Sequence, residues 1–456
     1  MSKSLPEITP KAVVLGILLS IILAGANAYL GLFAGMTVSA SIPAAVISMG
    51  VLRAFRNSNI LENNIVQTAA SAGESLAAGV IFTIPALVLM GVWNDFDYFE
   101  VAKIAAIGGV IGVLFTVPLR RALIVEAKLK YPEGVATAAV LQAGEESRSS
   151  DSKDQSGGLV TIGIAGVVGS IMKLCQQGLG MWHAAIEGAV VVRGSIFGLG
   201  TDLSPALISV GYIVGRNIGI LVIAGGLISW VIAIPIYSAI HGFEGDPMDA
   251  AWKIWNSEIR YLGVGAMVVG GIWSLIKLAK PLYYGIHASL LTLKKSGSGT
   301  ETPLAERDFP INYVGMALAV LLIPVFLLYF NIVHHAGIAV LLAVVMMVFG
   351  FLFSAVAAYM AGMVGSSNNP ISGVTIATIL FSSLLLLLLL GENSDVGAPA
   401  AIMIGAVVCC AAAIGGDNLQ DLKTGHIVGA TPWKQQVMQI VGTVSAALVL
   451  GLVLDI

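Results

Sequence analysis

The sequence predicts an all-α integral membrane protein that crosses the bilayer many times. Of its 456 residues, 57% are hydrophobic and only 11% are charged, and the mean hydropathy is +0.92. Ordinary globular chains carry roughly twice that charged fraction. Apolar stretches of about twenty residues, the length of a membrane-spanning helix, recur along the whole chain. The net charge of -3 gives no reason to expect a nucleic-acid partner, so the composition indicates the lipid bilayer as the main partner.

About thirteen stretches qualify as membrane spans. The first is too long for the apolar region of a signal peptide and other spans follow it, so we interpret it as a transmembrane helix. The stretch 204–240 could be two short helices or one long broken helix, and its glycines and Arg216 favour the break. The predicted spans cover residues 11–33, 36–52, 65–91, 102–119, 158–180, 204–217, 218–240, 259–281, 311–331, 336–361, 370–391, 397–415 and 436–454.

The basic residues predict the orientation of the chain. Arg53, Arg121 and Lys294 follow predicted spans that end on one side of the membrane, whereas the segments WNDFDYFE and HGFEGDPMDA are acidic. Because loops rich in Lys and Arg stay in the cytoplasm, we expect these basic loops and the N-terminus to be cytoplasmic. The polar segments near 145–157 and 294–308 are expected to be cytoplasmic linkers.

Two short motifs each occur twice, in the same order, and predict an internal repeat. The pattern G-M-x-x-S-x-x-x-P begins at Gly35 and again at Gly362. The pattern A-A-x-[A/G]-G-[E/D]-[S/N]-L begins at Ala69 and again at Ala412. Shared composition is the alternative explanation, because small residues are common in membrane helices.

On this span count the two copies run in opposite directions. Inverted copies are typical of secondary transporters, in which broken helices from both copies meet near the membrane midplane. If 204–240 is a single span, the copies would instead be parallel. We expect a first transmembrane repeat over 1–308, with about eight spans, and a partial second repeat over 309–456, whose spans match only the first four.

Glu74 is the main candidate for a functional residue. It lies in the middle of the third predicted span, within NNIVQTAASAGESLAAG, and Asp417 takes the matching position in the second copy. An ionisable group at a helix centre in the bilayer costs at least about 2.5 kcal/mol and usually faces a cavity or a partner. We therefore expect Glu74 to face a substrate or proton path. A structural partner, such as an arginine or a helix N-terminus, is the alternative.

Two further segments contribute candidates. In SSNNP, the residue before the proline favours extended backbone, which would leave backbone groups free to line a cavity; a plain loop or a helix cap is the alternative. The segment 131–144 predicts a helix that begins at a proline, either on the surface or re-entrant. The candidates for the substrate path are Asn63, Asn64, Gln67, Glu133, Asn368, Asn369, Pro370, Asp417, Asn418, Gln420, Asp421 and Lys423.

The sequence gives no sign of an enzyme, a cofactor or a metal site. The three cysteines lie in apolar stretches, and the histidines have no metal-ligand spacing. A phosphate-binding glycine-rich motif, H-E-x-x-H and a nucleophile elbow are all absent from the sequence. The run GGDN lacks the G-x-G-D pattern of intramembrane aspartyl proteases, because residue 414 is isoleucine. An intramembrane enzyme is therefore a remote alternative.

Several long motifs, in order along nearly the whole chain, resemble one family. GLFAGMTVSASIPAAVI, NNIVQTAASAGESLAAGVIFTIPAL, YPEGVATAAV, NNPISGVTIAT and GDNLQDLKTGHIVGATPWKQQ are similar to the oligopeptide transporter family. Its bacterial peptide-transporter branch and its plant yellow stripe-like members share the patterns LxQDxKTG and YPxGxATA. Family members continue well beyond residue 456, so the resemblance, like the repeat, implies a chain that is shortened at its C-terminus.

The resemblance implies a proton-coupled symporter that imports short peptides, in a bacterial inner membrane. A metal-chelate importer of the same family is the alternative, and a homo-oligomer is left open. Because a proton-coupled carrier needs a carboxylate that changes protonation between access states, we expect Glu74 to carry the proton, with Asp417 and Asp421 in gating or substrate contact. Lys423 could neutralise a substrate carboxylate or mark the cytoplasmic interface.

Overall fold

The chain folds into two compact units, of which the larger contains most of the apolar helices. Unit 1 comprises Met1–Leu159 and Gly271–Ile456, and unit 2 comprises Val160–Gly270. This computed structural model describes residues 5–149, 164–280 and 306–455, except 35, 36, 38, 56, 166, 173, 184, 204–207, 209–211, 213–215, 264, 267, 268, 271, 272, 274, 275, 277–279, 368, 370 and 393.

All the secondary-structure elements in the described residues of unit 1 are helices. Its π-helical turn η1 (Arg121–Glu126) follows directly on the end of α5. The α-helices are α1 (Pro10–Ala34), α2 (Ser41–Leu52), α3 (Ile60–Ile81), α4 (Pro85–Leu89), α5 (Tyr98–Arg120), α6 (Pro132–Ser149), α13 (Ile311–Val333), α14 (Ala336–Val364), α15 (Ile371–Leu390), α16 (Gly397–Val428) and α17 (Pro432–Leu454).

The prediction of a polytopic all-α membrane protein is confirmed. Nine helices in the described part of the chain are long and apolar enough to cross a membrane, and each matches a predicted span. Of the other four predicted spans, 36–52 forms only the shorter helix α2. Span 204–217 falls largely outside the described residues, and spans 158–180 and 259–281 are described only in part. The linkers predicted near 145–157 and 294–308 are likewise described only in part.

Two predicted boundaries differ from the structure in ways that matter for the site. Span 397–415 was expected to end before the polar run, but α16 continues to Val428, so Asp417 lies inside the helix rather than at its end. The leucines, glutamine and lysine of the polar run 416–425 are good helix formers, which explains the continuation. Span 65–91, expected to be too long for one straight helix, is interrupted where α3 ends and Pro85 begins α4.

Helices α3 and α16 form the centre of unit 1 and run antiparallel. Nearly every residue of α3 is buried, and α16 is buried from Ala400 to Gly425 apart from a few positions. Gln67 contacts Asp421, whereas Gly79, farther along α3, lies against Cys410, earlier in α16. A Cβ at Gly79 would lie only 2.4 Å from the Cα of Cys410, so the glycine permits the close approach.

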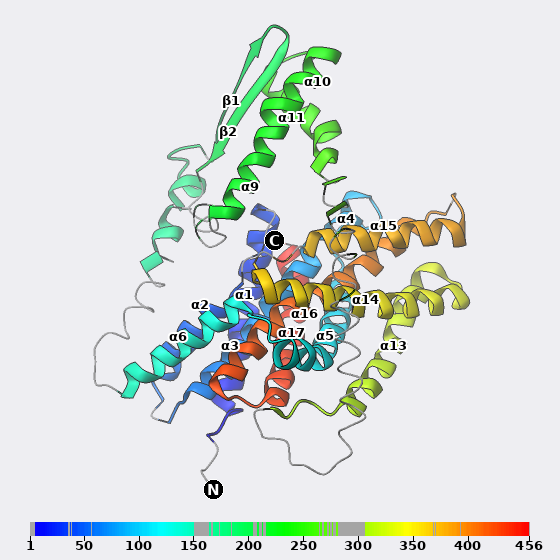
Figure 1. Cartoon of the computed structure of the whole chain (residues 1–456). Coiled ribbons are helices and arrows are strands. Elements are labelled where there is room, and N and C mark those ends of the chain that lie inside the picture. The colour runs from blue at the N-terminus through cyan, green and yellow to red at the C-terminus, as the bar shows by residue number, and fades with distance from the viewer. Residues whose placement is uncertain are drawn as a thin grey trace. The chain divides into compact units, whose positions relative to one another are not determined.

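Helices α5 and α17 flank this central pair, as Figure 1 shows for the helices around the middle of unit 1. Gly108 and Gly112 of α5 approach the backbone of α16 in the same order along both helices, so α5 and α16 run parallel. Gly442 of α17 lies against the backbone of Ala69 on α3, and α17 runs parallel to α3. The first-copy and second-copy helices that the repeat pairs therefore run in opposite directions.

Polar contacts gather several segments at one end of unit 1. The Glu7 carboxylate accepts hydrogen bonds from Thr431 N (2.9 Å) and Lys434 Nζ (3.0 Å), which joins the start of the chain to the turn between α16 and α17. The buried guanidinium of Arg120, at the end of α5, pairs with Asp308 at 2.5 Å. The beginnings of α1, α13 and α17 and the end of α5 thus lie together.

Unit 2 contains the feature that the sequence analysis did not anticipate, a β-hairpin. Strands β1 (Ala185–Val192) and β2 (Ser195–Asp202) pair antiparallel, with Ala185 opposite Asp202. Arg193 and Gly194 both have positive φ, as a two-residue hairpin turn requires. The β-branched run of β1 favours a strand, and no predicted membrane span covers residues 185–202.

Helical segments of unit 2 pack beside the hairpin through a small core that includes Ile196, Ile234 and Ala251. Figure 1 shows the hairpin with its neighbouring helices. The described segments are η3 (Leu174–Gly178), α9 (Arg216–Leu227), η4 (Ile228–Ala233), α10 (Ile234–His241), α11 (Pro247–Ile254) and η5 (Trp255–Ile259).

Candidate functional site

Four carboxylates of unit 1 lie close enough to interact electrostatically. Glu74 is on α3, Glu133 is on α6, and Asp417 and Asp421 are one turn apart on α16. Glu74 and Asp421 are buried, and the other two are half-buried. Among the described residues, none of the four forms an ion pair with Lys, Arg or His. We call this group, drawn from three separate parts of the sequence, the carboxylate cluster.

Glu74 is held at the N-terminus of α2. Its Oε2 accepts a hydrogen bond from the backbone N–H of Ala40 (3.1 Å), and its Oε1 accepts one from the side-chain amide of Asn27 on α1. The N-terminus of a helix carries partial positive charge, so it favours a carboxylate at this position. A helix N-terminus is thus a structural partner of Glu74, which was the alternative to a substrate or proton path. Glu74 nevertheless lies within the carboxylate cluster.

Asp421 links α16 to α2 and α3 through one of its two oxygens. Its Oδ1 accepts hydrogen bonds from Ser41 Oγ (3.1 Å) and from the side-chain amide of Gln67. The Gln67 Oε1 in turn accepts from Asn64 Nδ2 at 3.3 Å. The Oδ2 atom of Asp421 is buried and has no hydrogen-bond partner among the described residues. Asp421 therefore retains a free acceptor where Glu74 does not.

Asp417 lies between α3 and the loop that precedes α15. Ser75 on α3 and Ser366 in the loop are beside its carboxylate. Ser366 Oγ also donates to Glu133 Oε2, and the backbone N–H of Ser367 donates to Glu133 Oε1 at 3.0 Å. The loop thus joins the half-buried carboxylates of α6 and α16.

Gln420 fixes the beginning of α6 against α16. Its Oε1 accepts from the backbone N–H of Gly134 (2.8 Å), and its Nε2 donates to the carbonyl of Ala361 on α14 (2.8 Å). Thr424 Oγ1 donates to the Gly134 carbonyl at 2.9 Å, and a Cβ at Gly134 would lie 2.3 Å from the Gln420 carbonyl oxygen. Both ends of the Gln420 amide thus make hydrogen bonds within the protein, and these bonds hold the start of α6, which carries Glu133.

Tyr131, just before α6, joins this segment to α14. Its backbone N–H donates to the Gly362 carbonyl (2.9 Å), and its hydroxyl donates to the Ala358 carbonyl (3.0 Å). Burial raises the pKa of Tyr131 well above its ordinary value, so the phenol keeps the proton that it donates. The predicted proline-initiated helix begins at Pro132, as expected. Its start is held by hydrogen bonds to α14, through Tyr131, and to α16, through Gln420.

Several buried polar atoms near Asp421 have no hydrogen-bond partner within the described part of the chain. They include both side-chain amide atoms of Asn418, Oδ1 of Asn64 and Oε1 of Gln439. A buried polar group without a partner costs about 1–3 kcal/mol. These unpaired atoms, on α3, α16 and α17, include both donors and acceptors.

The remaining sequence candidates make other contacts or fall outside the described residues. At the start of α3, Asn63 Oδ1 accepts a hydrogen bond from Ser48 Oγ (3.1 Å), and Asn63 Nδ2 donates one to the carbonyl of Asn59 (3.2 Å). The half-buried Asn369 donates to the Ala357 carbonyl at 3.1 Å, and Lys423, also half-buried, has its Cβ beside Gly134. The candidates Asn368 and Pro370, and the repeat position Gly35, fall outside the described residues.

The sequence analysis missed several polar residues of the site. Asn27 and Ser41 supply the partners of Glu74 and Asp421 described above. Gln435 Nε2, on α17, donates to the backbone carbonyl of Asp421 (3.0 Å), and Gln439 Nε2 donates to that of Asn418 (3.1 Å). The available signal was PWKQQVMQ, where glutamines one helical turn apart begin an otherwise apolar span.

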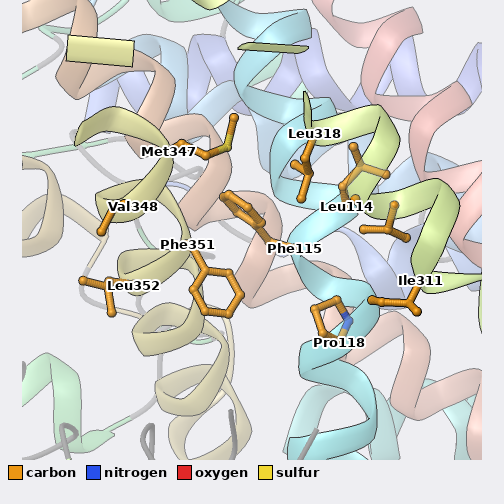
Figure 2. A pocket seen from close by; sticks show the side chains of 11 residues that line it. Leu114, Phe115, Pro118, Ile311, Leu318, Met347, Val348, Phe351 and Leu352 are labelled. Carbon is orange, nitrogen blue, oxygen red and sulfur yellow. The ribbon is translucent and has the colours of Figure 1, made fainter. Parts of the chain in front are cut away.

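A groove in unit 1 differs in chemistry from the carboxylate cluster. A groove of about 420 Å³ lies between α5, α13 and α14, and Figure 2 shows the side chains of Phe115, Pro118 and Phe351 along it. Every residue that lines it is apolar or glycine. It offers no side-chain donor or acceptor to a peptide, so we place the candidate site at the carboxylate cluster.

The described residues contain no group of three or more His, Cys, Asp or Glu side chains that could hold a metal ion. Asn27, Ser41, Gln67 and Ser366 donate side-chain hydrogen bonds to the carboxylates of the cluster.

Comparisons with known proteins identify the relatives of the chain. The family described as OPT oligopeptide transporter protein matches residues 7–456. A protein of Haemophilus influenzae named "Putative oligopeptide transporter" is 38% identical over 450 residues, which cover 94% of this chain and 69% of that protein.

Plant relatives are more distant. The metal-nicotianamine transporter YSL3 of Arabidopsis thaliana is 23% identical, over 95% of this chain and 68% of that protein. The iron-phytosiderophore transporter YSL15 of Oryza sativa subsp. japonica is also 23% identical, over 95% of this chain and 68% of that protein.

Proposed function

This chain belongs to the oligopeptide transporter (OPT) family, and we propose that it imports short peptides by proton-coupled secondary active transport. Members of this family are transporters rather than enzymes, so the intramembrane enzyme considered from the sequence is set aside. The relative at 38% identity has a name that refers to oligopeptide transport, which favours a peptide over a metal chelate as the substrate.

The observation that carries the proton coupling is the carboxylate cluster. Glu74, Glu133, Asp417 and Asp421 interact with one another, and no described cation pairs with any of them. Carboxylates buried side by side cannot all be ionised without a counter-charge. Protons supply that counter-charge most simply, and their release in one access state would couple transport to a proton gradient.

Within the cluster, we assign proton coupling to Glu74 and substrate contact or gating to Asp417 and Asp421. Glu74 bridges α1, α2 and α3 through Asn27 and Ala40, so a change in its protonation would alter contacts between three helices. Asp421 has a free oxygen beside other unpaired polar atoms, which suits recognition of a peptide's amide and ammonium groups.

The bacterial relative and the basic loops support a bacterial inner membrane with the N-terminus in the cytoplasm. The opposite directions of α3 and α16 support two inverted repeats, over 1–308 and 309–456, with the cluster between helices of both.

Import of metal chelates is the second candidate, because the yellow stripe-like relatives carry names that refer to metal complexes. The lack of a metal-ligand group among the described residues does not separate the two substrates, since a chelate brings its own ligands. The discriminating property is the substrate itself.

Uptake by proteoliposomes tests the proposal. The purified chain would be reconstituted, and accumulation of radiolabelled di-, tri- and tetrapeptides compared with that of iron and nickel chelates, with and without an inward proton gradient. We expect peptide accumulation that requires the gradient and is abolished by a protonophore. The exposed variant Glu100→Gln serves as a matched control that should transport normally. Gradient-driven uptake of chelates but not peptides would favour the second candidate.

A further inference from the structure

Unit 2 contains a cavity whose chemistry differs from that of the carboxylate cluster. It has a volume of about 460 Å³, within the range that holds a small molecule. Its walls include Glu187 of β1, Leu227 of α9, Trp230 of η4, and Met248 and Trp252 of α11. We call this cavity the tryptophan pocket.

The walls of the tryptophan pocket combine a negative charge with aromatic faces. Trp252 Nε1 donates to Glu187 Oε2 at 3.1 Å, which holds the carboxylate at the wall while its Oε1 keeps acceptor capacity. Trp230 packs edge-to-face on Trp252, with ring centroids 4.9 Å apart. Within the described residues, no cationic side chain pairs with Glu187 or lies over either ring.

Glycines keep the pocket open. A Cβ at Gly198 would lie 3.1 Å from the ring of Trp230, and a Cβ at Gly200 would lie 3.0 Å from Glu187 Cβ. Glycine inside a strand weakens it and often marks a place where a ligand approaches closely. Gly226 also lines the pocket, and a Cβ there would meet nothing within 4 Å. A larger side chain at Gly226 would therefore enter open space.

We propose that the tryptophan pocket binds the primary ammonium group of a small molecule whose apolar body packs against Met248 and Leu227. The face of a tryptophan ring attracts a cation, and a carboxylate beside it adds a charge-assisted hydrogen bond from the ammonium N–H. The negative charge of Glu187 disfavours anions. A quaternary ammonium ion could use the rings but could donate no hydrogen bond to Glu187.

The competing explanation is that the tryptophans belong to an aromatic belt at the membrane interface. Rings of such a belt need only face lipid and headgroups, and they require neither a concave pocket nor a carboxylate that accepts a hydrogen bond from an indole N–H. Binding at the pocket does not depend on the transport function proposed above, because every residue used here belongs to unit 2.

Isothermal titration calorimetry on the purified full chain in detergent tests the proposal. The probe is L-leucinamide at pH 6.5, where its amine is protonated, with the neutral N-acetyl-L-leucinamide and tetramethylammonium as comparisons. We expect saturable binding of leucinamide, at least tenfold weaker binding of tetramethylammonium, and no measurable binding of the neutral analogue. Equal binding of the neutral analogue, or tighter binding of tetramethylammonium, would overturn the assignment.

Two pairs of variants locate the binding. Glu187→Gln keeps an acceptor for Trp252 but removes the charge, and should weaken leucinamide binding at least tenfold; Glu244→Gln, an exposed change in the same unit, should not. Gly226→Leu should block the pocket, whereas the adjacent Gly225→Leu, also in open space but not part of the wall, should not. If Glu187→Gln binds as tightly as the unmodified chain, or the two leucine variants behave alike, leucinamide binds elsewhere.

Discussion

Glu74 and Asp421 differ in how many of their oxygen atoms are already used. Both oxygens of Glu74 accept hydrogen bonds, from Asn27 and from the backbone of Ala40, whereas Oδ2 of Asp421 has no partner among the described residues. Protonating Glu74 would weaken its attraction to the N-terminus of α2, because that site favours the charged form. A proton on Glu74 would thereby loosen the contact between α2 and α3.

This difference predicts distinct effects for two isosteric substitutions. Glu74→Gln removes the ionisable group and should abolish accumulation driven by a pH gradient, while counterflow exchange of peptide continues. Asp417 lies beside the loop before α15, and Asp417→Asn should impair both activities by at least about tenfold. That factor corresponds to the loss of one hydrogen bond to a charged group, about 1.5 kcal/mol. The measurement is radiolabelled peptide uptake and exchange in proteoliposomes at symmetric pH and across a pH gradient.

Glu74→Asp is the matched control, because it keeps a titratable carboxyl at the same position. It should retain gradient-driven accumulation, at a reduced rate, since the shorter side chain reaches Ala40 less well. Accumulation against a gradient by Glu74→Gln would show that another group carries the proton.

The ion pair of Arg120 and Asp308 gives a stability prediction. Arg120 is 1% exposed and Asp308 is 18% exposed, so the pair is largely withdrawn from water. Asp308→Asn would leave the guanidinium without its counter-charge and should lower the free energy of unfolding by about 3 kcal/mol or more. The pair of Lys103 and Glu100 is more exposed, at 49% and 31%, so Glu100→Gln should change the free energy of unfolding by less than about 0.5 kcal/mol.

Denaturant titration in detergent, followed by tryptophan fluorescence, measures both variants. Equal stability losses for Asp308→Asn and Glu100→Gln would mean that the buried pair of Arg120 and Asp308 contributes no more to the free energy of unfolding than the more exposed pair does.

At the scale of elements, glycines decide how closely the central helices approach. Gly79→Ala would place a Cβ 2.4 Å from the backbone of Cys410, and two backbones cannot separate locally without disturbing α3 and α16. We expect a loss of about 1–3 kcal/mol in unfolding free energy, as for other overpacked interiors. Gly25→Ala on α1 meets only Val453 Cγ2 at 3.5 Å and should be neutral or slightly stabilising, because alanine favours a helix.

Thermal unfolding in detergent compares the two alanine variants directly. If Gly25→Ala lowers the melting temperature as much as Gly79→Ala does, close approach of α3 and α16 is not what the glycine at 79 provides.

The long apolar helices were predictable because hydropathy reports them directly. Span 311–331 differs from α13 (Ile311–Val333) by two residues at one end. The end of α16 was not predictable by the same criterion, since its polar turns are buried by α3, α6 and α17 rather than exposed. Likewise, Ala185–Val192 is apolar enough for a helix, and only its pairing with β2 selects a strand.

The site residues that could be predicted are charged residues within apolar segments. The hydrogen-bond partners of those residues could not be predicted. Glu74 and Asp417 stand out because carboxylates in apolar segments are costly. Nothing in the sequence shows that the side chain of Gln420 makes hydrogen bonds to Gly134 and Ala361, or that Asn27 donates a hydrogen bond to Glu74. Such pairings follow from helix packing, which sequence periodicity does not specify.

At the scale of the whole molecule, contacts within unit 1 determine which segments share a side of the membrane. Glu7 binds the turn at Thr431, and Arg120 binds Asp308, so the start of the chain, the end of α5 and the starts of α13 and α17 lie at one end. Helices that begin at that end, such as α3, and helices that finish there, such as α16, must cross in opposite directions. The basic residues of these segments then predict that this end is cytoplasmic.

Cysteine labelling tests that orientation. Single cysteines would replace Asp95, in the loop before α5, and Arg121, just after α5, in a chain whose native Cys175, Cys409 and Cys410 are changed to serine or alanine. Both positions are at least partly exposed, so each can react when a reagent reaches it. Because α5 joins them across the bilayer, a membrane-impermeant maleimide added to intact cells should modify position 95 and spare position 121. Permeabilising the cells should expose both, which controls for reactivity, and labelling of 121 but not 95 in intact cells would reverse the proposed orientation and place the N-terminus outside.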